Sequence, residues 1–262
     1  MELIVFLWFL GLIVGFISAF FGIGGGTLMV PTLQWLFPDM PMKMIIATSL
    51  MGIFINSITF LGKSKNEYTL PREHIKWLII YSLIGAQIGN FILPHVSDVT
   101  LQYLFIALLV VTIVRLIFEK MMNPKRLMQT SNTKIAFIAL CGGIVSALTG
   151  LGGGIVIIPL LLILTSVDLK LINYYSHLSM IFSALNGIIN HSFEKVAYNP
   201  DFLPDLVLGS HHIGIIMIMQ LGIIISTPIG IKLNSGTSAN SKRTSLIILL
   251  ILITLKMFLK AI

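Results

Sequence analysis

Charged side chains are scarce in this sequence. Only 10% of its 262 residues are Asp, Glu, Lys or Arg, whereas 56% are hydrophobic, and the mean hydropathy is +0.98. A soluble domain carries about 25% charged residues, so there is too little polar surface to cover a water-soluble globule. The apolar runs, such as 101–116, do not alternate as the strands of an outer-membrane barrel do. The composition predicts an all-α polytopic membrane protein.

Cysteine and intramembrane carboxylates are nearly missing as well. The single cysteine, Cys141, excludes an internal disulfide framework and a metal site built from cysteines. All ten Asp and Glu lie outside the middle of the apolar segments, which removes the usual carboxylate proton relay of a pump. No catalytic motif stands in a recognisable context. We therefore expect no enzyme activity, no metal and no cofactor.

The net charge of +7 comes from Lys and Arg in short loops. Such charges report membrane orientation, and no basic run is interleaved with aromatics, so we expect no nucleic-acid partner. The chain begins Met1-Glu2 and lacks the positive region that opens a secretory signal. We expect its first apolar segment to be part of the mature protein.

One glycine-rich stretch occurs twice. Residues 15–31 read GFISAFFGIGGGTLMVP, and residues 143–159 read GIVSALTGLGGGIVIIP. The offset is 128, and eight of the 17 positions are identical, namely five glycines, Ser, Ala and Pro. Glycine lets a chain leave the helical region and expose its backbone. Both copies stand in strongly apolar surroundings, which predicts a helix broken inside the membrane.

The apolar segments follow the same order in both halves. A helix needs about 20 residues to cross a bilayer, so the segment after each glycine stretch is too short. The segments are 3–21, 27–37, 44–61, 75–93 and 101–118, then 135–149, 155–165, 171–191, 213–231 and 244–259. We predict two pseudo-symmetric four-helix repeats, residues 1–120 and 135–262, each with its first helix broken and joined by a basic linker, residues 121–134.

Loop charges indicate how the two halves are related. Loop 62–73 is basic and its counterpart 192–212 is acidic, whereas loop 94–98 lacks Lys and Arg and its counterpart 232–243 has three. Because positive loops stay in the cytoplasm, this swap favours inverted repeats. Inversion needs an odd number of crossings, so we expect each glycine stretch to reverse the chain inside the membrane. Loops 62–74 and 119–134 would then lie inside and both termini outside.

A glycine loop that opens a short helix suits an anion. The first turn of a helix has free N–H groups, and they lie at the positive end of the helix dipole. Two half-helices in matching positions are typical of a secondary transporter's central site. Pro31 and Pro159 are expected near the start of each short helix, where proline is tolerated. The predicted backbone ligands are Gly22, Gly24, Gly25, Gly26, Gly150, Gly152, Gly153 and Gly154.

Two other roles are possible for glycines in this pattern. Close helix packing is expected for Gly11, Gly85 and Gly89, but it does not explain three consecutive glycines twice. Neither copy has the Gly-Lys-Ser/Thr of a nucleotide-binding P-loop. An anion-binding role is therefore the interpretation we favour for the two glycine stretches.

Polar side chains within the apolar segments could complete the site. Thr48 and Ser49 fall on Ser176 and His177 at the offset of 128. Intramembrane polar groups indicate function by default, but interhelical hydrogen bonds of about 1 kcal/mol each are the alternative, and both interpretations stay open. The second is favoured for Asn56, Gln87, Asn90, Asn186, Asn190 and Gln220, and solvation is expected for His191, His211 and His212.

The paired G-x-G-G-G-x4-P motif, each copy followed by a helix bearing Thr or Ser, resembles the TauE/SafE family of sulfite exporters. The resemblance covers essentially the whole chain. It implies an inner-membrane permease for sulfite, sulfonates or other small, often sulfur-containing anions. The main departure from symmetry is His177, which stands where the first half has Ser49.

The function predicted from this sequence is transport of a small, sulfur-containing anion across the bacterial inner membrane by alternating access. The chain would be a multi-pass protein whose two glycine loops face a central cavity. A passive anion channel and a non-transport membrane assembly protein are the alternatives. The expected partners are the anion and the lipid bilayer, and the coupling ion and oligomeric state are left open.

Overall fold

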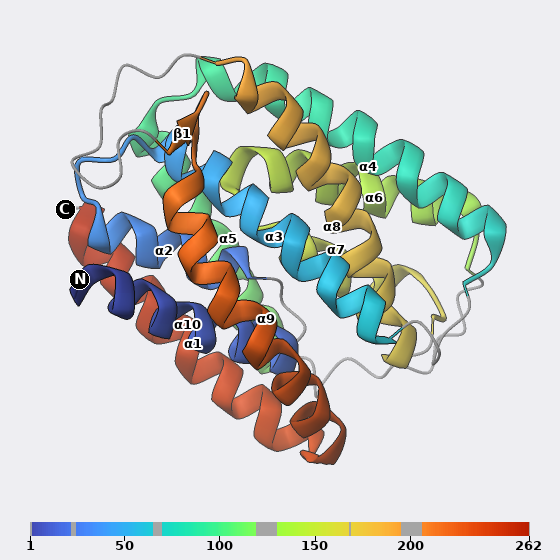
Figure 1. The fold of residues 1–262 in the computed structure, drawn as a ribbon. Coiled ribbons are helices and arrows are strands. Elements are labelled where there is room, and N and C mark those ends of the chain that lie inside the picture. The colour runs from blue at the N-terminus through green and yellow to red at the C-terminus, as the bar shows by residue number, and fades with distance from the viewer. Residues whose placement is uncertain are drawn as a thin grey trace.

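The computed structural model describes residues 2–21, 25–64, 70–118, 130–167, 169–194 and 206–261. Gly22, Gly24 and most of the predicted linker 121–134 lie outside these ranges. Helices make up nearly all of the described chain (Figure 1). They are α1 (Glu2–Phe21), α2 (Gly26–Leu36), α3 (Met42–Ser64), α4 (Arg72–Ile92), α5 (Asp98–Phe118), α6 (Asn132–Thr149), α7 (Gly154–Leu164), α8 (Leu169–Ser192), α9 (Ile213–Gly236) and α10 (Ala239–Ala261), with a 3-10 turn η1 (Leu93–His95) and strands β1 (Val207–Leu208) and β2 (His211–His212).

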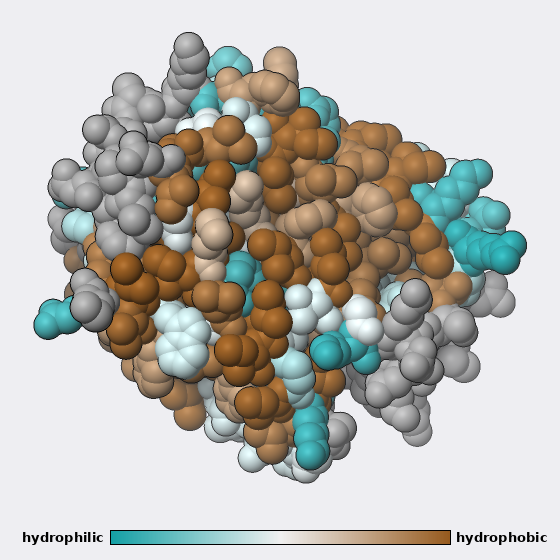
Figure 2. Space-filling model, viewed as in Figure 1, coloured by the Kyte–Doolittle hydropathy of each residue, from teal (hydrophilic) through white to brown (hydrophobic). Residues whose placement is uncertain are grey.

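Every apolar segment predicted from the sequence forms a helix, and α2 and α7 are the two short ones. Within the described ranges, six helices are long and apolar enough to cross a membrane: α1, α3, α4 with η1, α5, α6 and α9. Large apolar side chains face outward from them, such as Phe91 at 74% exposure and Val111 at 64%. Apolar residues cover the middle of the face in Figure 2, as a lipid-facing surface requires. The chain is an all-α polytopic membrane protein.

Two helix pairs pack in parallel at glycine contacts. In the first pair, Gly15 of α1 faces Ile223 of α9, and Gly230 of α9 faces Phe16 of α1. A Cβ at Gly230 would lie 2.5 Å from the Phe16 carbonyl oxygen. Residue numbers rise together along the contact, so α1 and α9 run in the same direction, and small residues let their backbones approach closely.

The second parallel pair is α4 with α6. Gly89 of α4 lies against Ile144 and Ala147 of α6, and a Cβ at Gly89 would be 2.7 Å from the Ala147 Cβ. Gly85 of α4 lies against Leu140. These contacts, with that of Gly11 against Met219, confirm the packing role predicted for Gly11, Gly85 and Gly89.

The long helices α3 and α8 cross the centre of the molecule in opposite directions. Ser57 of α3 contacts His177 and Met180 of α8, whereas Leu50, nearer the start of α3, lies against Gly187, nearer the end of α8. Figure 1 shows α3 and α8 side by side between the α1–α9 pair and the α4–α6 pair.

Both short helices turn the chain back. The carbonyl of Gly52 and the side chain of Asn56 on α3 pair with Gln220 and Thr227 of α9 in rising order, so α3 runs parallel to α9 and hence to α1. The chain therefore returns through α2 before α3 begins, and the ring of Trp35 near the end of α2 lies 6.4 Å from that of Phe6 near the start of α1. The same hairpin follows α6, because α6 and α8 both run parallel to α4.

The order of the helices gives the molecule two chemically different ends. The last turns of α3, α5, α7 and α9 lie at one end, which we name the basic end. The start of α1, the end of α10 and the last turns of α2, α4 and α8 lie at the other, the acidic end (Figure 1). Among the Lys and Arg whose side chains the structure describes, all fall toward the basic end except Lys43 and Lys256.

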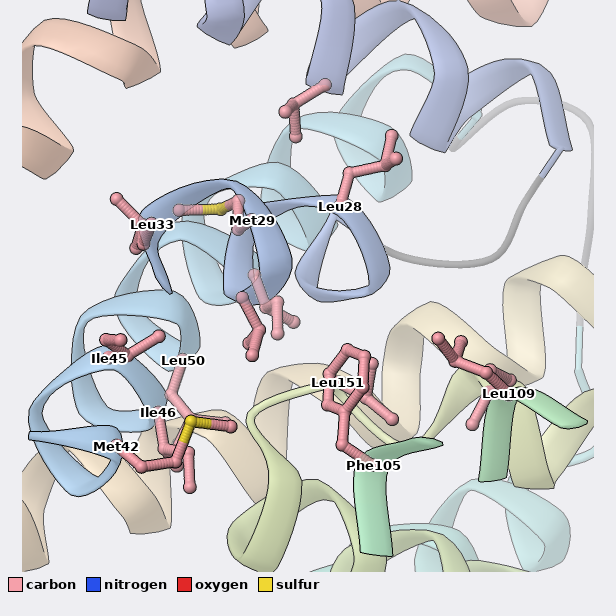
Figure 3. Close-up of a cluster of buried hydrophobic side chains, with 14 of the residues drawn as sticks. Leu28, Met29, Leu33, Met42, Ile45, Ile46, Leu50, Phe105, Leu109 and Leu151 are labelled. Atoms are coloured by element: carbon pink, nitrogen blue, oxygen red, sulfur yellow. The ribbon is translucent and has the colours of Figure 1, made fainter. Parts of the chain in front are cut away.

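The largest buried apolar cluster joins α2, α3, α5 and the second glycine loop (Figure 3). Leu33 of α2, Ile46 of α3, Phe105 of α5 and Leu151 of the loop are all fully buried. Burial of such side chains contributes about 1.5–3 kcal/mol each. The second glycine loop is thus embedded in packed protein.

Pro31 and Pro159 are placed differently from the prediction. Each stands inside its short helix, in α2 and α7, and not near the start. An interior proline removes one backbone hydrogen bond and kinks the helix. The error arose because the glycines themselves, at Gly26 and Gly154, already form the first turn.

Candidate functional site

Gly25–Gly26, the described end of the first glycine stretch, meets the second glycine loop at the centre of the molecule. Gly26, at the start of α2, lies against the carbonyl of Gly150, and a Cβ on it would be 2.8 Å from the Cα of Leu151 and 2.6 Å from the Cδ1 of Ile53. Gly152 also lies against Ile53, where a Cβ on the glycine would be 2.9 Å from the Cγ2 of Ile53. The middle of α3 is therefore the element against which both loops pack.

The second loop needs glycine for its backbone conformation. Gly150, Gly152 and Gly153 have φ angles of 66°, 81° and 74°, in the left-handed region that other residues rarely adopt. Gly153 also lies against the backbone of Gly142, where a Cβ would be 2.9 Å from the carbonyl carbon. The glycines that the sequence predicts as ligands thus also allow the chain to turn between α6 and α7.

Both short helices begin at the loops and direct their first turns toward them. The N–H groups of Val156 and Ile157 donate to the Gly153 carbonyl at 2.9 Å. The N–H groups before them, of Gly154 and Ile155, have no preceding helical carbonyl to pair with. The first turn of α2 repeats this geometry, with Met29 donating to Gly25 at 2.9 Å. Two positive helix ends therefore converge where the loops meet.

Ser49 and Thr48 of α3 have different partners, although both are fully buried. The Ser49 hydroxyl donates to the Gly150 carbonyl at 2.8 Å, so it lies beside the second glycine loop. The Thr48 hydroxyl accepts from the N–H of His212 at 3.1 Å, so it holds the strand before α9. Of the two neighbours, Ser49 is the one that contacts a glycine loop in this structure.

His177 of α8 is buried with one ring nitrogen unused. Its Nδ1 lies 3.1 Å from the Ser57 hydroxyl, which itself donates to the Met180 sulfur at 3.7 Å. The Ser57 hydroxyl can instead rotate to donate its one hydrogen to Nδ1, and the Nε2 of a neutral His177 ring then carries the ring hydrogen and can donate. The ring stacks on Phe60 at 4.0 Å between centroids. In the described part of the structure, neither the Nε2 of His177 nor the hydroxyl of Ser176 has a hydrogen-bond partner.

Buried polar atoms without partners are rare and call for an explanation. The ten predicted site residues that the structure describes are all buried. Met180 connects the two groups of residues, because its sulfur accepts from Ser57 and lies 3.4 Å from the Cβ position of Gly152. Ser49, His177 and the second glycine loop therefore belong to one buried region.

The remaining intramembrane polar residues pair between helices, as predicted. Asn56 donates to Ser18 of α1 at 2.9 Å and accepts from Thr227 of α9 at 3.2 Å. The other interhelical bonds are those of Asn90 to Asn186, of Asn186 and Asn190 to Gln87, and of Gln220 to the Gly52 carbonyl.

The prediction that His191, His211 and His212 are solvated was wrong, since all three are fully buried. Strands β1 and β2 form an antiparallel hairpin that brings His211 against α3 and α8. The alternation of a two-residue strand is too short to detect in a sequence, and only the packing of the hairpin buries these rings.

Glu194 joins this histidine cluster at the acidic end. It lies 2.8 Å from the Nδ1 of His191 and accepts from Ser210 at 3.1 Å. The hydrogen bond from His191 lowers the pKa of the Glu194 carboxyl, against the effect of burial. Burial lowers the pKa of His211, although hydrogen bonds to the carbonyls of Ile188 and Ala47 oppose it.

Two further observations concern a cavity and possible metal ligands. A cavity of about 450 Å³ lies between α1, α2 and α10, with Trp35 and Lys256 among its lining residues. It is distinct from the region where the glycine loops meet. Within the ranges the structure describes, no three His, Cys, Asp or Glu side chains gather closely enough to hold a metal ion.

Comparison with known proteins identifies the family. The sulfite exporter TauE/SafE family model matches residues 7–257. The chain belongs to the TauE/SafE family. The match confirms the resemblance seen in the paired glycine motif and covers every helix that surrounds the two loops.

Relatives of this TauE/SafE chain carry transporter names. A probable membrane transporter protein of Methanocaldococcus jannaschii is 30% identical over 248 residues, which cover 90% of this chain and 88% of that protein. One from Haemophilus influenzae is 28% identical over 218 residues, covering 79% and 78%. No solved structure matches the chain. Family and relatives together support membrane transport as the broad role of this multi-pass membrane protein.

Proposed function

We propose that the protein moves a small, sulfur-containing anion across the bacterial inner membrane by alternating access, without enzymatic chemistry. The observation that carries the proposal is the convergence of two helix N-termini, at Gly25–Gly26 and Gly153–Gly154, in one buried region. Backbone N–H groups there would bind the anion. Ser49 and His177, with Ser176 beside it, would supply side-chain donors, and Thr48 would support the site from the neighbouring turn.

Inverted repeats are part of this proposal. In sequence, α3 corresponds to α8 and α5 to α10. Both pairs run antiparallel, since Leu50 lies against Gly187 and Arg243, near the start of α10, donates at 2.6 Å to Ile117, near the end of α5. Parallel repeats would give parallel counterparts. The antiparallel pairing supports a two-fold axis in the membrane plane, with the boundary between repeats in the 121–134 linker.

The packing contacts repeat with the same correspondence. Gly230 lies against Phe16 and Ala19. Gly230 of α9 corresponds to Gly89 of α4 at the offset of 141, and Phe16 and Ala19 of α1 correspond to Ile144 and Ala147 of α6 at the offset of 128. The corresponding contact, Gly89 against Ile144 and Ala147, is also present. Each repeat thus pairs its first helix with the other repeat. Rocking of these interlocked halves around the glycine loops would expose the site to either side in turn.

The charge difference between the two ends supports an orientation. Lys and Arg concentrate at the basic end, and positive loops remain in the cytoplasm. We therefore propose that the basic end is cytoplasmic and that both termini are extracytoplasmic.

A flux assay with purified protein in proteoliposomes tests the function. Radiolabelled sulfite, sulfate, thiosulfate and a sulfonate would be offered in turn. We expect saturable flux for at least one of them and one-for-one exchange with unlabelled anion on the opposite side. Flux that rises linearly with concentration, without exchange, would favour the channel alternative.

Paired variants connect the flux to the site. Ser49→Ala removes a hydroxyl beside the second glycine loop, and we expect it to reduce flux. Thr254→Ala is the matched control, because that hydroxyl donates only to Leu250 of its own helix, at 2.7 Å. Equal flux in both variants would contradict the assigned site, and no flux of any anion would contradict transport itself.

A further inference from the structure

The β1–β2 hairpin closes the acidic end of the central helix pair. The N–H of Ser210 donates to the His191 carbonyl of α8 at 2.9 Å, and the His212 N–H donates to Thr48 of α3 at 3.1 Å. Three consecutive residues of α3 then connect hairpin and site. Ala47 and Thr48 bind the hairpin, and Ser49 binds the Gly150 carbonyl.

His211 is the side chain that fixes the hairpin to both helices. Its Nδ1 lies 2.9 Å from the Ala47 carbonyl oxygen of α3, and its Nε2 lies 3.1 Å from the Ile188 carbonyl oxygen of α8. A neutral imidazole has one N–H and can donate to only one of them. A protonated ring can donate to both, but its charge is then buried in a fully enclosed position.

The groups around His211 decide whether the docked ring is neutral, with one carbonyl left unpaired, or protonated, with its charge buried. Glu194, in the segment after α8, favours the charged ring, whereas His191 of α8 disfavours it. The charge of Lys43 of α3 contributes to the lowered pKa of Glu194. The hairpin itself adds His212, next to His211. In α9, residues 213–231 include no ionisable side chain. Burial is the largest effect and lowers the pKa of His211. The docked hairpin therefore holds the neutral ring.

We propose that His211 is a proton-binding site whose occupancy releases the β1–β2 hairpin from α3 and α8 and opens the acidic end toward the glycine loops. A proton from hydronium adds to the ring nitrogen of His211 that carries no hydrogen, and a water molecule is left. Because the docked ring binds a proton more weakly than a hydrated one, protonation favours the undocked hairpin. The inference rests on the proposed function for its consequence, which is that acid outside opens the path to the anion site.

A cysteine reporter tests release without requiring transport. Ser210 is fully buried on the hairpin, so Ser210→Cys in a Cys141→Ser background would react with a charged thiol reagent only after release. The full-length protein in lipid nanodiscs would be labelled at about pH 7.5 and about pH 5, on either side of the ordinary histidine pKa of about 6.5. Val99→Cys, at 58% exposure near the same end, corrects for the pH dependence of the thiol reaction.

We expect the labelling rate of Ser210→Cys relative to Val99→Cys to rise on acidification, by up to about tenfold per pH unit for one proton. His211→Gln, which can still hydrogen-bond but cannot titrate, should abolish the rise, and the exposed His95→Gln should leave it unchanged. A flat ratio with His211 present, or the same rise in His211→Gln, would overturn the inference.

Two more measurements separate the possible outcomes. A pH response that disappears in His191→Gln but persists in His211→Gln would also overturn the assignment. If His211→Gln does not fold, histidine ¹⁵N spectra of the unmodified protein replace it, and a His211 ring that gains no proton between those pH values refutes the site. Absence of anion flux alongside pH-dependent labelling would reject the proposed function while leaving the proton site intact.

Discussion

His177 carries the chemistry that distinguishes the second half of the chain from the first. When Ser57 donates to its Nδ1, the Nε2 carries the ring hydrogen, and in the described structure this buried Nε2 has no partner. In the proposed function, a ring held in one orientation by stacking on Phe60 would give the anion a fixed point of attachment. The hydroxyl of Ser176, also buried and unpaired in that part of the chain, lies next to it in sequence.

Replacing His177 with alanine should weaken substrate binding. Loss of one hydrogen bond to an ionised ligand costs about 1.5–3 kcal/mol, so the substrate concentration for half-maximal flux should rise by at least about tenfold. The measurement is the concentration dependence of anion flux. Ser57→Ala is the comparison, because it removes the support of the ring but not the ring, and it should raise that concentration less. An equal or larger effect of Ser57→Ala would show that His177 acts through position and not by contact.

The short helices α2 and α7 each begin inside the molecule, so each break places a helix N-terminus in the interior. The chain leaves α6 through Gly150 in a left-handed conformation and enters α7 after Gly153 in another. α7 is only 11 residues long and ends near the start of α8 at the basic end of the molecule. Its first turn therefore lies in the interior of the molecule, away from either end. Such irregular backbone is tolerated in a membrane only when protein or water surrounds it, and here α3 and α8 provide that protein.

Glycine at position 153 should be essential to the fold of this element. Gly153→Ala places a side chain at a φ of 74° and against the backbone of Gly142. The left-handed conformation alone costs about 1–2 kcal/mol, so the midpoint of thermal unfolding should fall by several degrees. Gly62→Ala is the matched control, because a Cβ there meets nothing within 4 Å. We expect no loss of stability for Gly62→Ala, and a similar loss in both variants would contradict the strain assigned to the second loop.

For the whole molecule, the interlocked pairing of α1 with α9 and of α4 with α6 means that neither half packs alone. Each pair depends on backbones that touch at glycine, so a relative movement of the halves must carry a helix of the other half with it. The crossing of α3 and α8 is where such movement would change access to the glycine loops. In the proposed alternating access, the two halves would therefore move as interlocked bodies.

The proposed orientation predicts which positions an impermeant reagent reaches in intact cells. In a Cys141→Ser background, Val99→Cys at the acidic end should be labelled from outside. Gly62→Cys and Gly236→Cys, at the basic end in positions where a side chain meets no neighbour, should react only after the membrane is permeabilised. The opposite pattern would reverse the topology while leaving the fold unchanged.

The sequence by itself determined the class of protein, the position of every helix and the family. Those conclusions depend on local properties, namely hydropathy over about 20 residues and a repeated glycine pattern. Both properties can be evaluated from residues that lie close together in the sequence. Sequence reasoning also predicted the reversal of the chain at each glycine stretch, since loop charges constrain the number of crossings. The direction of neighbouring helices agrees with that reversal.

Only the tertiary structure decided how the polar residues pair. Thr48 and Ser49 are adjacent and similar, yet one binds the hairpin and the other a glycine loop, because successive residues of a helix point about 100° apart. The burial of His211 was equally inaccessible to the sequence, since it depends on contacts with Ala47, 164 residues away. Contacts between residues so far apart in the sequence depend on how the helices pack, and the local sequence pattern does not predict them.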